Sequence, residues 1–470
     1  MKMKASTSYI HNVSAQAIGR FFTGLISIIV FILIGRLMGP GELGQFSYIL
    51  TFFGFLFIFS EVGTPSVFAK DISQIKEAKD IYLANYLVLR IGLALLFIIP
   101  GIIAAYFLRK DLFFILSIGV VFLPLFNLRF FEPLYQVYNK PLFSAYTAFF
   151  YGAIYFTLSL IAVIFFKNIS SISLSYIVAN ILYALFALYL STRILKPKFT
   201  IRTSIIKNIM KLALPMGVGA LFATVNSHID IFMLASMKSD YEVGIYSAAY
   251  RFLDMTAMLA VTILNPIIPI FSKWALENRQ LLKERYTQLI ETFSVATLPV
   301  ALAIPFITPL IVRSIYGQDF LPSADVLNIL AWVGVLLFLS LLTMSLCLSI
   351  GVVHFGWWIT ALAAGVNIFL NYIWIPKYSY IGSAWATVIC ELLILGVVSF
   401  FVIKHIGNFI RFLIWIKIIF ANIIFCLLLH FIKNVYLGLI LGTTIYVLMV
   451  VSLKVIPSHF LSLIKNLLKK

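Results

Sequence analysis

The residues of this 470-residue chain that could do chemistry are ionisable side chains placed inside long apolar runs. A charge in the hydrocarbon layer is costly, so each should contact a partner or face a water-filled cavity. The basic members, which could bind an anionic substrate, are Arg20, Arg90, Arg129 and Arg251. The residues that could line a cavity or bind a coupling ion are Glu61, Glu132, Asn226, Asp230 and Asp254, and the further intramembrane acids are Glu291 and Glu391.

Two of the arginines have an acid three residues further along the chain. Arg129 precedes Glu132, and Arg251 precedes Asp254. On a helix, residues three apart share one face, so each acid can neutralise its own base. Such pairs could be purely structural. Alternatively, an anionic ligand competes for the arginines, whose planar guanidinium groups suit a diphosphate.

Arg20 and Arg90 have no acid within one helical turn in the sequence. Their charges must therefore be balanced by another helix or by a ligand. Arg20 lies near the start of the first apolar run, at its expected cytoplasmic end, and could extend to the lipid headgroups instead. Arg90 lies deeper in its run, which makes it the stronger candidate for substrate contact.

A polar cluster interrupts the apolar run that contains Asp230. Asn226 and Asp230 lie one helical turn apart, with Ser227 and His228 between them. The cluster should line a cavity and could relay a proton or a sodium ion, with Glu61 as a further candidate. Hydrogen bonding between helices is the commoner use of such residues. Apart from H⁺ or Na⁺ coupling, we expect no cofactor and no metal site, because the Cys and His residues lack metal-binding spacing.

Membrane helices must position these residues. Hydrophobic residues make up 62% of the chain and charged residues 11%, and the mean hydropathy is +1.05. This leaves too little polar surface for a soluble protein of this length, so the sequence predicts an all-α integral membrane protein. We expect about fourteen spanning helices, at roughly 15–37, 43–69, 82–108, 112–138, 142–166, 171–194, 206–235, 242–272, 286–312, 323–350, 354–375, 380–403, 410–432 and 435–456.

The net charge of +18 follows from topology. Most of the 35 Lys and Arg residues fall in alternate loops, which places both termini on the cytoplasmic side of the cytoplasmic membrane. These loops contact anionic membrane lipids, and we expect no nucleic-acid partner. The chain contains no phosphate-binding GxxxxGK loop, no HExxH motif and no long segment outside the apolar runs. The sequence therefore argues against an enzyme.

An internal repeat indicates how the helices are organised. Residues 42–47 (ELGQFS) and 242–247 (EVGIYS) share the pattern acid, aliphatic, Gly, any residue, aromatic, Ser at an offset of 200 residues. Each copy follows one long apolar run and begins the next. The repeated unit is therefore a bundle of several membrane helices, which is how many transporters are built.

Several stretches resemble the polysaccharide-exporter and O-antigen flippase family. They are GRLMGPGELG at 35–44, VGIYSAAYR at 243–251, YGQDF at 316–320 with PSA at 322–324, and NIFLNYIWIP at 367–376 followed by GSAWAT at 382–387 and Glu391. With the fourteen-span layout, the resemblance covers nearly the whole chain. It implies the fold of the multidrug and toxic compound extrusion (MATE) transporters, with two six-helix lobes related by a pseudo-two-fold axis. We place the lobes at 1–200 and 201–404, and two further helices with a basic tail at 405–470.

The resemblance also implies a function. Family members carry polyprenyl-diphosphate-linked oligosaccharides to the outer leaflet for surface glycan assembly, through cavities that are typically cationic. Glycan polymerases or transferases are the expected protein partners. Three rivals stay open: a flippase for the peptidoglycan lipid precursor, a cation-coupled drug exporter of the MATE type, and a membrane-embedded glycosyltransferase or polymerase.

Overall fold

The structure is a computed structural model that describes residues 2–75, 77–352, 356–432 and 434–455, without the side chains of 2–18 and 20. The described residues form helices and connecting turns, with no strand among them. They group into two compact units, residues 1–244 and 245–470. The predicted lobe boundary near residue 200 stays a prediction.

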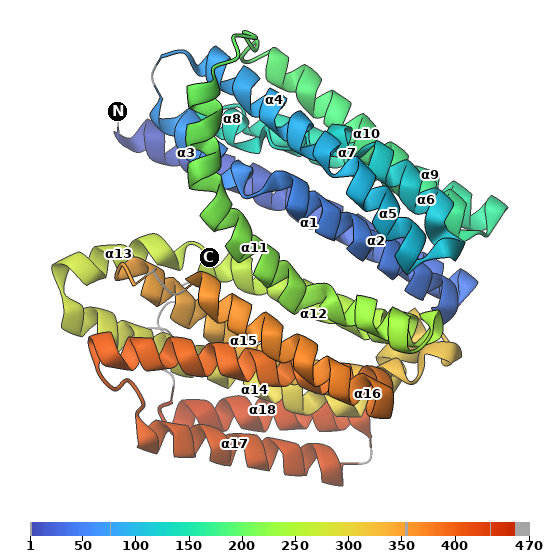
Figure 1. Ribbon diagram of the computed structural model, residues 1–470. Helices are drawn as coiled ribbons and strands as arrows, with labels where there is room; N and C mark the ends of the chain where they lie inside the picture. The colour runs from blue at the N-terminus through green and yellow to red at the C-terminus, as the bar shows by residue number, and fades with distance from the viewer. Residues whose placement is uncertain (1, 76, 353–355, 433, 456–470) are drawn as a thin grey trace. The chain divides into compact units, whose positions relative to one another are not determined.

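The first unit contains the helices coloured blue to green in Figure 1. Helix α11 packs against α2, α3 and α4 within this unit. The main helices are α1 (Lys2–Met38), α2 (Pro40–Glu61), α3 (Thr64–Gln74), α4 (Lys79–Leu96), α5 (Ile98–Leu108), α6 (Phe113–Val121), α7 (Leu123–Phe126), α8 (Glu132–Val137), α9 (Pro141–Ile161), α10 (Ile169–Thr192), α11 (Thr203–Met237) and the start of α12 (Asp240–Leu264).

Glycine and proline set the limits of α2. Gly39 has a φ of 98°, and Pro40, which has no N–H to satisfy, begins the helix. The helix ends at Glu61, and the next two residues, Val62 and Gly63, both have positive φ. A Cβ on Gly63 would lie 2.5 Å from the backbone nitrogen of Gly217 in α11, so a side chain there would collide with that helix. The break between α2 and α3 is therefore packed directly against another helix.

The run at 112–138, where Pro124 predicts a kink, is broken into several pieces rather than forming one kinked helix. The structure has the short helices α6, α7 and α8 there, separated at Phe122 and at residues 127–131. Pro124 and Pro133 each remove a backbone donor and occupy first-turn positions of α7 and α8. The Asn127 side chain donates to the Leu123 carbonyl oxygen at 3.2 Å, a local bond that competes with helix continuation. The interruption leaves backbone oxygens and side chains free to bind distant partners.

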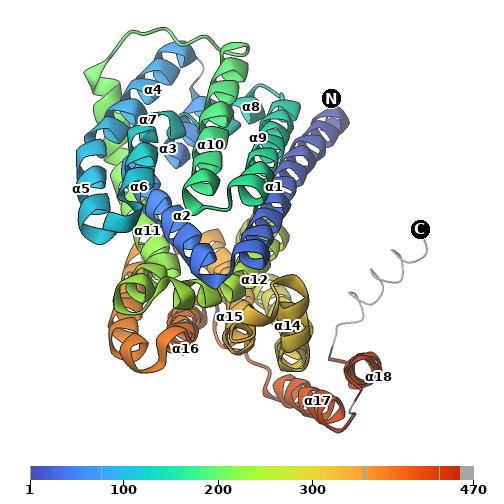
Figure 2. The same cartoon turned by 90° about the vertical axis from the view of Figure 1, so that its right-hand side faces the viewer.

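The second unit begins within α12 and contains six further long elements. Helices α17 and α18 lie side by side in Figure 2 and contact α14. The bounds are α13 (Ile267–Glu277), α14 (Arg279–Ile315), α15 (Ser323–Ser349), α16 (Gly356–Ile406), α17 (Phe412–Phe431) and α18 (Val435–Ser452).

Element α16 is two helices joined by a reversal. Ser379 has a φ of 50° and a ψ of −135°, which no helix accommodates. A Cβ on Gly382 would lie 2.8 Å from the Trp374 carbonyl oxygen, so only glycine fits where the chain folds back. The Cys390 sulfur donates to the Ala363 carbonyl oxygen at 3.5 Å. On one straight helix these two residues would be roughly 40 Å apart.

Twelve helices among the described residues are long and apolar enough to cross a membrane. The fourteen expected runs reduce to twelve for two reasons. The runs at 354–375 and 380–403 both belong to α16, which counts once, and the run at 112–138 is broken into pieces too short to count. The predicted fold class is confirmed in its main feature: the described residues form an all-α protein whose long helices are apolar enough to cross a membrane.

Prolines in α14 explain how α17 and α18 are attached. Pro299 has no N–H to donate to the carbonyl oxygen of Val295 four residues earlier. The Tyr446 hydroxyl of α18 donates to that oxygen at 2.9 Å. Arg411, which precedes α17, donates to the carboxylate of Glu291, whose side chain is 1% exposed. The carbonyl oxygen that Pro299 leaves without a donor is therefore bound by α18, and the buried carboxylate is bound by the residue that precedes α17.

The two copies of the repeated motif meet in the first unit. A Cβ on Gly44 would lie 1.8 Å from the Asp240 carbonyl oxygen, and one on Gly244 would lie 1.8 Å from the Pro40 carbonyl oxygen. Each glycine therefore packs against the backbone at the start of the other helix. Small residues allow such close helix crossings in membranes.

An ion-pair cluster lies beside this crossing. Arg109 donates to both carboxylate oxygens of Asp240, at 2.8 and 2.9 Å, and also to Asp111. Burial alone would lower the pKa of Arg109, but these hydrogen bonds outweigh burial and raise it. The hydrogen bond from Arg109 lowers the pKa of Asp111. The stabilisation from Asp111 is therefore present above the ordinary Asp pKa of about 4 and is lost as the pH falls through the lowered value.

Candidate functional site

The first unit contains a polar cavity around Arg129. Arg129 lies in the non-helical segment between α7 and α8, so its side chain is not held on a helix face. Its Nη1 donates to Asn180 Oδ1 at 2.5 Å. Its guanidinium carbon lies 4.9 Å from the centre of the Tyr183 ring and 5.8 Å from that of Tyr151. Aromatic faces attract a cation without neutralising its charge.

Arg129 has no ion pair with a carboxylate among the described residues. The expected pair with Glu132 does not form, because residues 128–130 are not helical and the two side chains do not share a helix face. Both nevertheless line the same cavity. A ligand anion can therefore approach Arg129 without first displacing a protein carboxylate.

The cavity has a volume of about 190 Å³ and is built from α1, α8, α9, α10 and the segment before α8. It offers a guanidinium, a carboxylate, three phenols and three aliphatic hydroxyl groups. Guanidinium groups bind anionic oxygens, and phenol rings offer flat faces and a hydroxyl. Its lining is Gly19, Thr23, Arg129, Glu132, Tyr135, Ser144, Thr147, Ala148, Tyr151 and Tyr183.

Sequence reasoning identified Arg129 and Glu132 but missed the aromatic and amide partners. Tyr151, Tyr183 and Asn180 come from α9 and α10, which are distant in the sequence from Arg129. Aromatic residues make up 16% of the chain, so no pattern distinguished these tyrosines. Asn180 in the middle of an apolar run was the one signal that could have been used.

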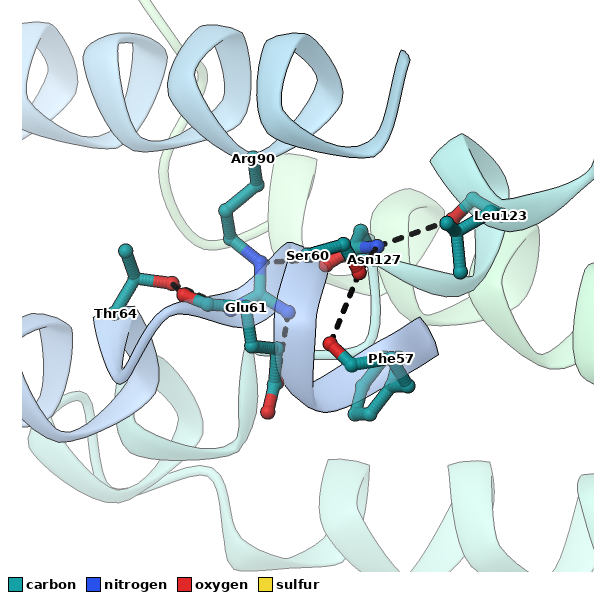
Figure 3. A network of polar contacts seen from close by, with 7 residues as sticks. All are labelled: Phe57, Ser60, Glu61, Thr64, Arg90, Leu123 and Asn127. Atoms are coloured by element: carbon teal, nitrogen blue, oxygen red, sulfur yellow. Dashed lines mark hydrogen bonds and ion pairs between the residues drawn. The ribbon is translucent and has the colours of Figure 1, made fainter. Parts of the chain in front are cut away.

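Arg90 lies in a second polar network, which is buried (Figure 3). Its Nη2 donates to Glu61 Oε1 at 2.9 Å, its Nη1 to Thr64 Oγ1 at 2.8 Å, and its Nε to the Asn127 carbonyl oxygen at 2.8 Å. The guanidinium carbon also lies 4.9 Å from the centre of the Phe130 ring. The Arg90 charge is thus balanced across helices by Glu61, one of the two alternatives left open by the sequence.

The network connects three helix ends. Glu61 ends α2, Thr64 begins α3, and Asn127 follows α7. The Asn127 side chain also donates to Ser60 Oγ at 2.8 Å. Arg90 is 0% exposed. This geometry gives Arg90 and Glu61 a structural role, and substrate contact by Arg90 and ion coupling by Glu61 stay predictions.

The other predicted residues lie elsewhere. Arg251 and Asp254 form the expected pair in α12, with Nη1 and Oδ2 3.2 Å apart. Asp230 in α11 is 1% exposed and accepts from the Ile231 backbone N–H. Asn226 is half-buried in the same helix. These four residues do not line the Arg129 cavity. The Arg20 side chain lies outside the described residues, although its neighbour Gly19 lines that cavity.

The second unit contains two apolar cavities lined by the same segment of α14. A groove of about 340 Å³ lies between α14, α17 and α18 and includes Phe425, Tyr446 and Val450. A cavity of about 460 Å³ lies between α12, α14 and α15 and includes Met255 and Phe338. Ala296 and Val300 line both of them.

Comparison with known protein families gives two matches. A family model described as polysaccharide biosynthesis protein matches residues 10–275, and one described as MatE matches residues 215–373. The teichuronic acid biosynthesis protein TuaB of Bacillus subtilis is 24% identical over 115 residues. That match spans 23% of this chain and 23% of TuaB, so it covers less than a quarter of the relative's length.

Several solved structures share the fold. A structure described as the lipid II flippase MurJ in an inward closed conformation is 19% identical, has a TM-score of 0.74, and matches over 92% of this chain and 97% of its own. An inward-facing multidrug resistance MATE transporter is 16% identical with a TM-score of 0.62, over 81% and 94% of the two chains. A multidrug/oligosaccharidyl-lipid/polysaccharide (MOP) superfamily transporter from Pyrococcus furiosus is 16% identical with a TM-score of 0.57, over 85% and 96%. At these identities the likeness assigns the fold alone.

Proposed function

Because the chain belongs to the polysaccharide biosynthesis protein family, we propose that it is a flippase for a polyprenyl-diphosphate-linked oligosaccharide. It moves this lipid across the cytoplasmic membrane for surface polysaccharide assembly. The observation that carries the proposal is the cavity around Arg129. Among the described residues, the hydrogen-bonding and ring partners of Arg129 are all neutral. The family, the fold and this cationic cavity support the same class of substrate.

The physical task is to shield a charged, hydroxyl-rich head from hydrocarbon. A diphosphate loses its hydration when it leaves water, and this cost must be offset by polar protein groups. Arg129 provides a charge-assisted donor for phosphate oxygens, and Tyr151 and Tyr183 provide ring faces and hydroxyls for a sugar. The cavity of about 190 Å³ holds only part of a lipid-linked oligosaccharide. We therefore assign it one phosphate or sugar unit of the head.

The prenyl tail requires an apolar path, and the second unit offers one. The groove between α14, α17 and α18 has an almost entirely apolar lining. Ala296 and Val300 also line the larger cavity between α12, α14 and α15. In our proposal the tail occupies the groove while the head crosses by alternating access of the two lobes.

Flipping makes and breaks no covalent bond, so the proposed function requires no catalytic group. This fits a transporter rather than an enzyme. A cytoplasmic location of both termini, contact with membrane lipids and association with a glycan polymerase or transferase belong to the same proposal. Coupling of transport to H⁺ or Na⁺ is also part of this proposal. The candidate residues for binding the coupling ion are Glu132 in the Arg129 cavity and Asn226, Asp230 and Asp254.

The likeness to the lipid II flippase MurJ supports a second candidate, transport of lipid II. A drug exporter of the MATE type would share the fold. A cationic drug is a poor match for a cavity in which Arg129 has no paired carboxylate, because the guanidinium would repel it. Competition between lipid-linked oligosaccharide and lipid II in one transport assay distinguishes the two lipid substrates.

The Arg129→Gln variant should lose most of its transport. Removing the charge removes a charge-assisted hydrogen bond of about 1.5–3 kcal/mol, which corresponds to a rate loss of about tenfold or more if it acts in the rate-limiting step. Arg129→Lys should retain part of the rate. The measurement is translocation of a fluorescent polyprenyl-diphosphate oligosaccharide in proteoliposomes.

Arg193→Gln is the matched control for this variant. Arg193 also lies over a tyrosine ring, 5.0 Å from the centre of Tyr189, but it is exposed on the surface. Its variant should transport at close to the wild-type rate. An Arg129→Gln protein that translocates the lipid as fast as wild type would refute the assignment of this cavity.

The Val300→Trp variant tests the tail path. A larger side chain at this position fills the boundary that the groove and the neighbouring cavity share. Transport of a long-chain polyprenyl probe should fall several-fold, whereas a probe with a truncated chain should be affected much less. Equal inhibition of both probes would indicate a general packing defect rather than a blocked tail path.

A further inference from the structure

Glu391 is a half-buried acid in the second half of α16, and none of the roles assigned above uses it. It lies within a predicted span, in an element long and apolar enough to cross a membrane. Ser340 of α15, which is 4% exposed, is its hydrogen-bonding partner. A carboxyl group at this depth is costly if it is ionised without a cation.

The hydrogen bonds of Ser340 indicate which form Glu391 takes. The Ser340 hydroxyl contacts both the Leu337 carbonyl oxygen, at 3.2 Å, and Glu391 Oε1. A hydroxyl has one proton to donate, and neither a carbonyl oxygen nor a carboxylate can donate one. One hydroxyl proton can be shared between two acceptors, but two full hydrogen bonds form when Glu391 is protonated. It then donates to Ser340 Oγ, which donates to Leu337.

Among the described residues, Glu391 has apolar neighbours in sequence and no cation paired with it. The side chains of Leu337, Leu341, Ile394 and Leu395 in α15 and α16 belong to an apolar cluster. The structure shows no ion pair to Glu391 among the described residues.

The charged groups of the neighbouring helices form no ion pair with Glu391 among the described residues. Besides the groups named below, α14 carries Arg279, Lys283, Glu284, Arg285 and Arg313 near its ends, and in α13 Lys273 pairs with Glu277. In α15 the one charged residue is Asp325, and in α16 the others are Lys377, Lys404 and His405 near the helix ends. In α14, Glu291 has its cation in Arg411. In α12, Arg251 pairs with Asp254.

We propose that Glu391 is a proton-binding site, protonated in this conformation and able to release its proton to water in another. On release, the carboxyl proton leaves to solvent. Ser340 then turns its hydroxyl from Leu337 toward the carboxylate, so the serine donates to one oxygen in either form. As a corollary that rests on the proposed function, this proton is the one that couples transport to a pH gradient.

The protonation state can be measured directly on the full-length protein in nanodiscs at neutral pH by infrared spectroscopy. Wild type should show the carbonyl stretching band of a protonated carboxyl. Glu391→Gln should lose this band, and Ser340→Ala should keep it at a shifted frequency because the hydrogen bond is lost. Glu277→Gln, at an exposed carboxylate, should leave the band unchanged. A band that persists at full intensity in Glu391→Gln, or no band in wild type, overturns the proton site.

The coupling is tested by flipping of the fluorescent polyprenyl-diphosphate oligosaccharide in proteoliposomes with and without an imposed pH gradient. Wild-type flipping should change several-fold with the gradient, and the Glu391→Gln rate should not change. A wild-type rate that is insensitive to the gradient overturns the coupling. If wild type does not flip the probe at all, the proposed function fails, while the infrared result still decides whether Glu391 binds a proton.

Discussion

A Gly244→Ala protein should be too unstable to purify in its native form. The added Cβ would lie 1.8 Å from the Pro40 carbonyl oxygen, so α2 and α12 must separate at their closest point. Overpacking ordinarily costs about 1–3 kcal/mol. Here the obstacle is backbone rather than a flexible side chain, so we expect a loss above about 3 kcal/mol. Thermal unfolding in detergent, followed by fluorescence-detected size-exclusion chromatography, measures the loss.

Gly54→Ala is the control, because Gly54 belongs to the same helix α2 and has open space around its Cβ position. Replacing a helical glycine with alanine there should stabilise the protein by up to about 1 kcal/mol. The Gly44→Ala and Gly244→Ala changes should be strongly non-additive, since either one already separates the helices. If the Gly244→Ala and Gly54→Ala proteins had the same melting temperature, the result would contradict the observed helix crossing.

The Arg90→Met variant should show the second large effect. Removing the guanidinium leaves the Glu61 carboxylate, whose side chain is 16% exposed, without a cation. It also leaves Thr64 and the Asn127 carbonyl oxygen without their donor. Breaking one side of a buried ion pair costs about 3–5 kcal/mol. The expected result is a marked fall in melting temperature and in yield from the membrane.

A double variant separates the two interpretations of Arg90. If its role is structural, adding Glu61→Met to Arg90→Met should restore much of the stability, because no charge is then left buried alone. If Arg90 instead contacts substrate, the single variant should fold at normal yield but fail to transport. A fully stable Arg90→Met protein without transport would refute the structural role and support the substrate role predicted from sequence.

The sequence predicted most of the fold because apolar length is a local signal. Every long helix of the structure overlaps a predicted run. The error at 112–138 has a local cause that hydropathy ignores, namely Pro124, Pro133 and the Asn127 side chain. Hydropathy also separated the two halves of α16 correctly, where the structure shows a reversal at Ser379 and Gly382.

The candidate site was only partly predictable because its contacts are long-range. Arg129 and Glu132 were found as charges in an apolar run, but their separation by non-helical backbone was not foreseen. The partner of Arg90 lies 29 residues away in another helix, so spacing rules for one helix could not identify it. The glycines of the repeat indicated a duplication, but their contact with each other's helix required the structure.

The Glu291–Arg411 pair has a consequence for biogenesis. The two residues are 120 positions apart, so α14 leaves the ribosome long before its cation is made. At about 5–20 residues per second, roughly 6–24 s of synthesis separate them. During that interval the insertion machinery, rather than the finished bundle, must hold a helix that carries a lone acid. A chain truncated before Arg411 should therefore be recognised by membrane quality-control proteases through α14, even though both predicted lobes have been synthesised.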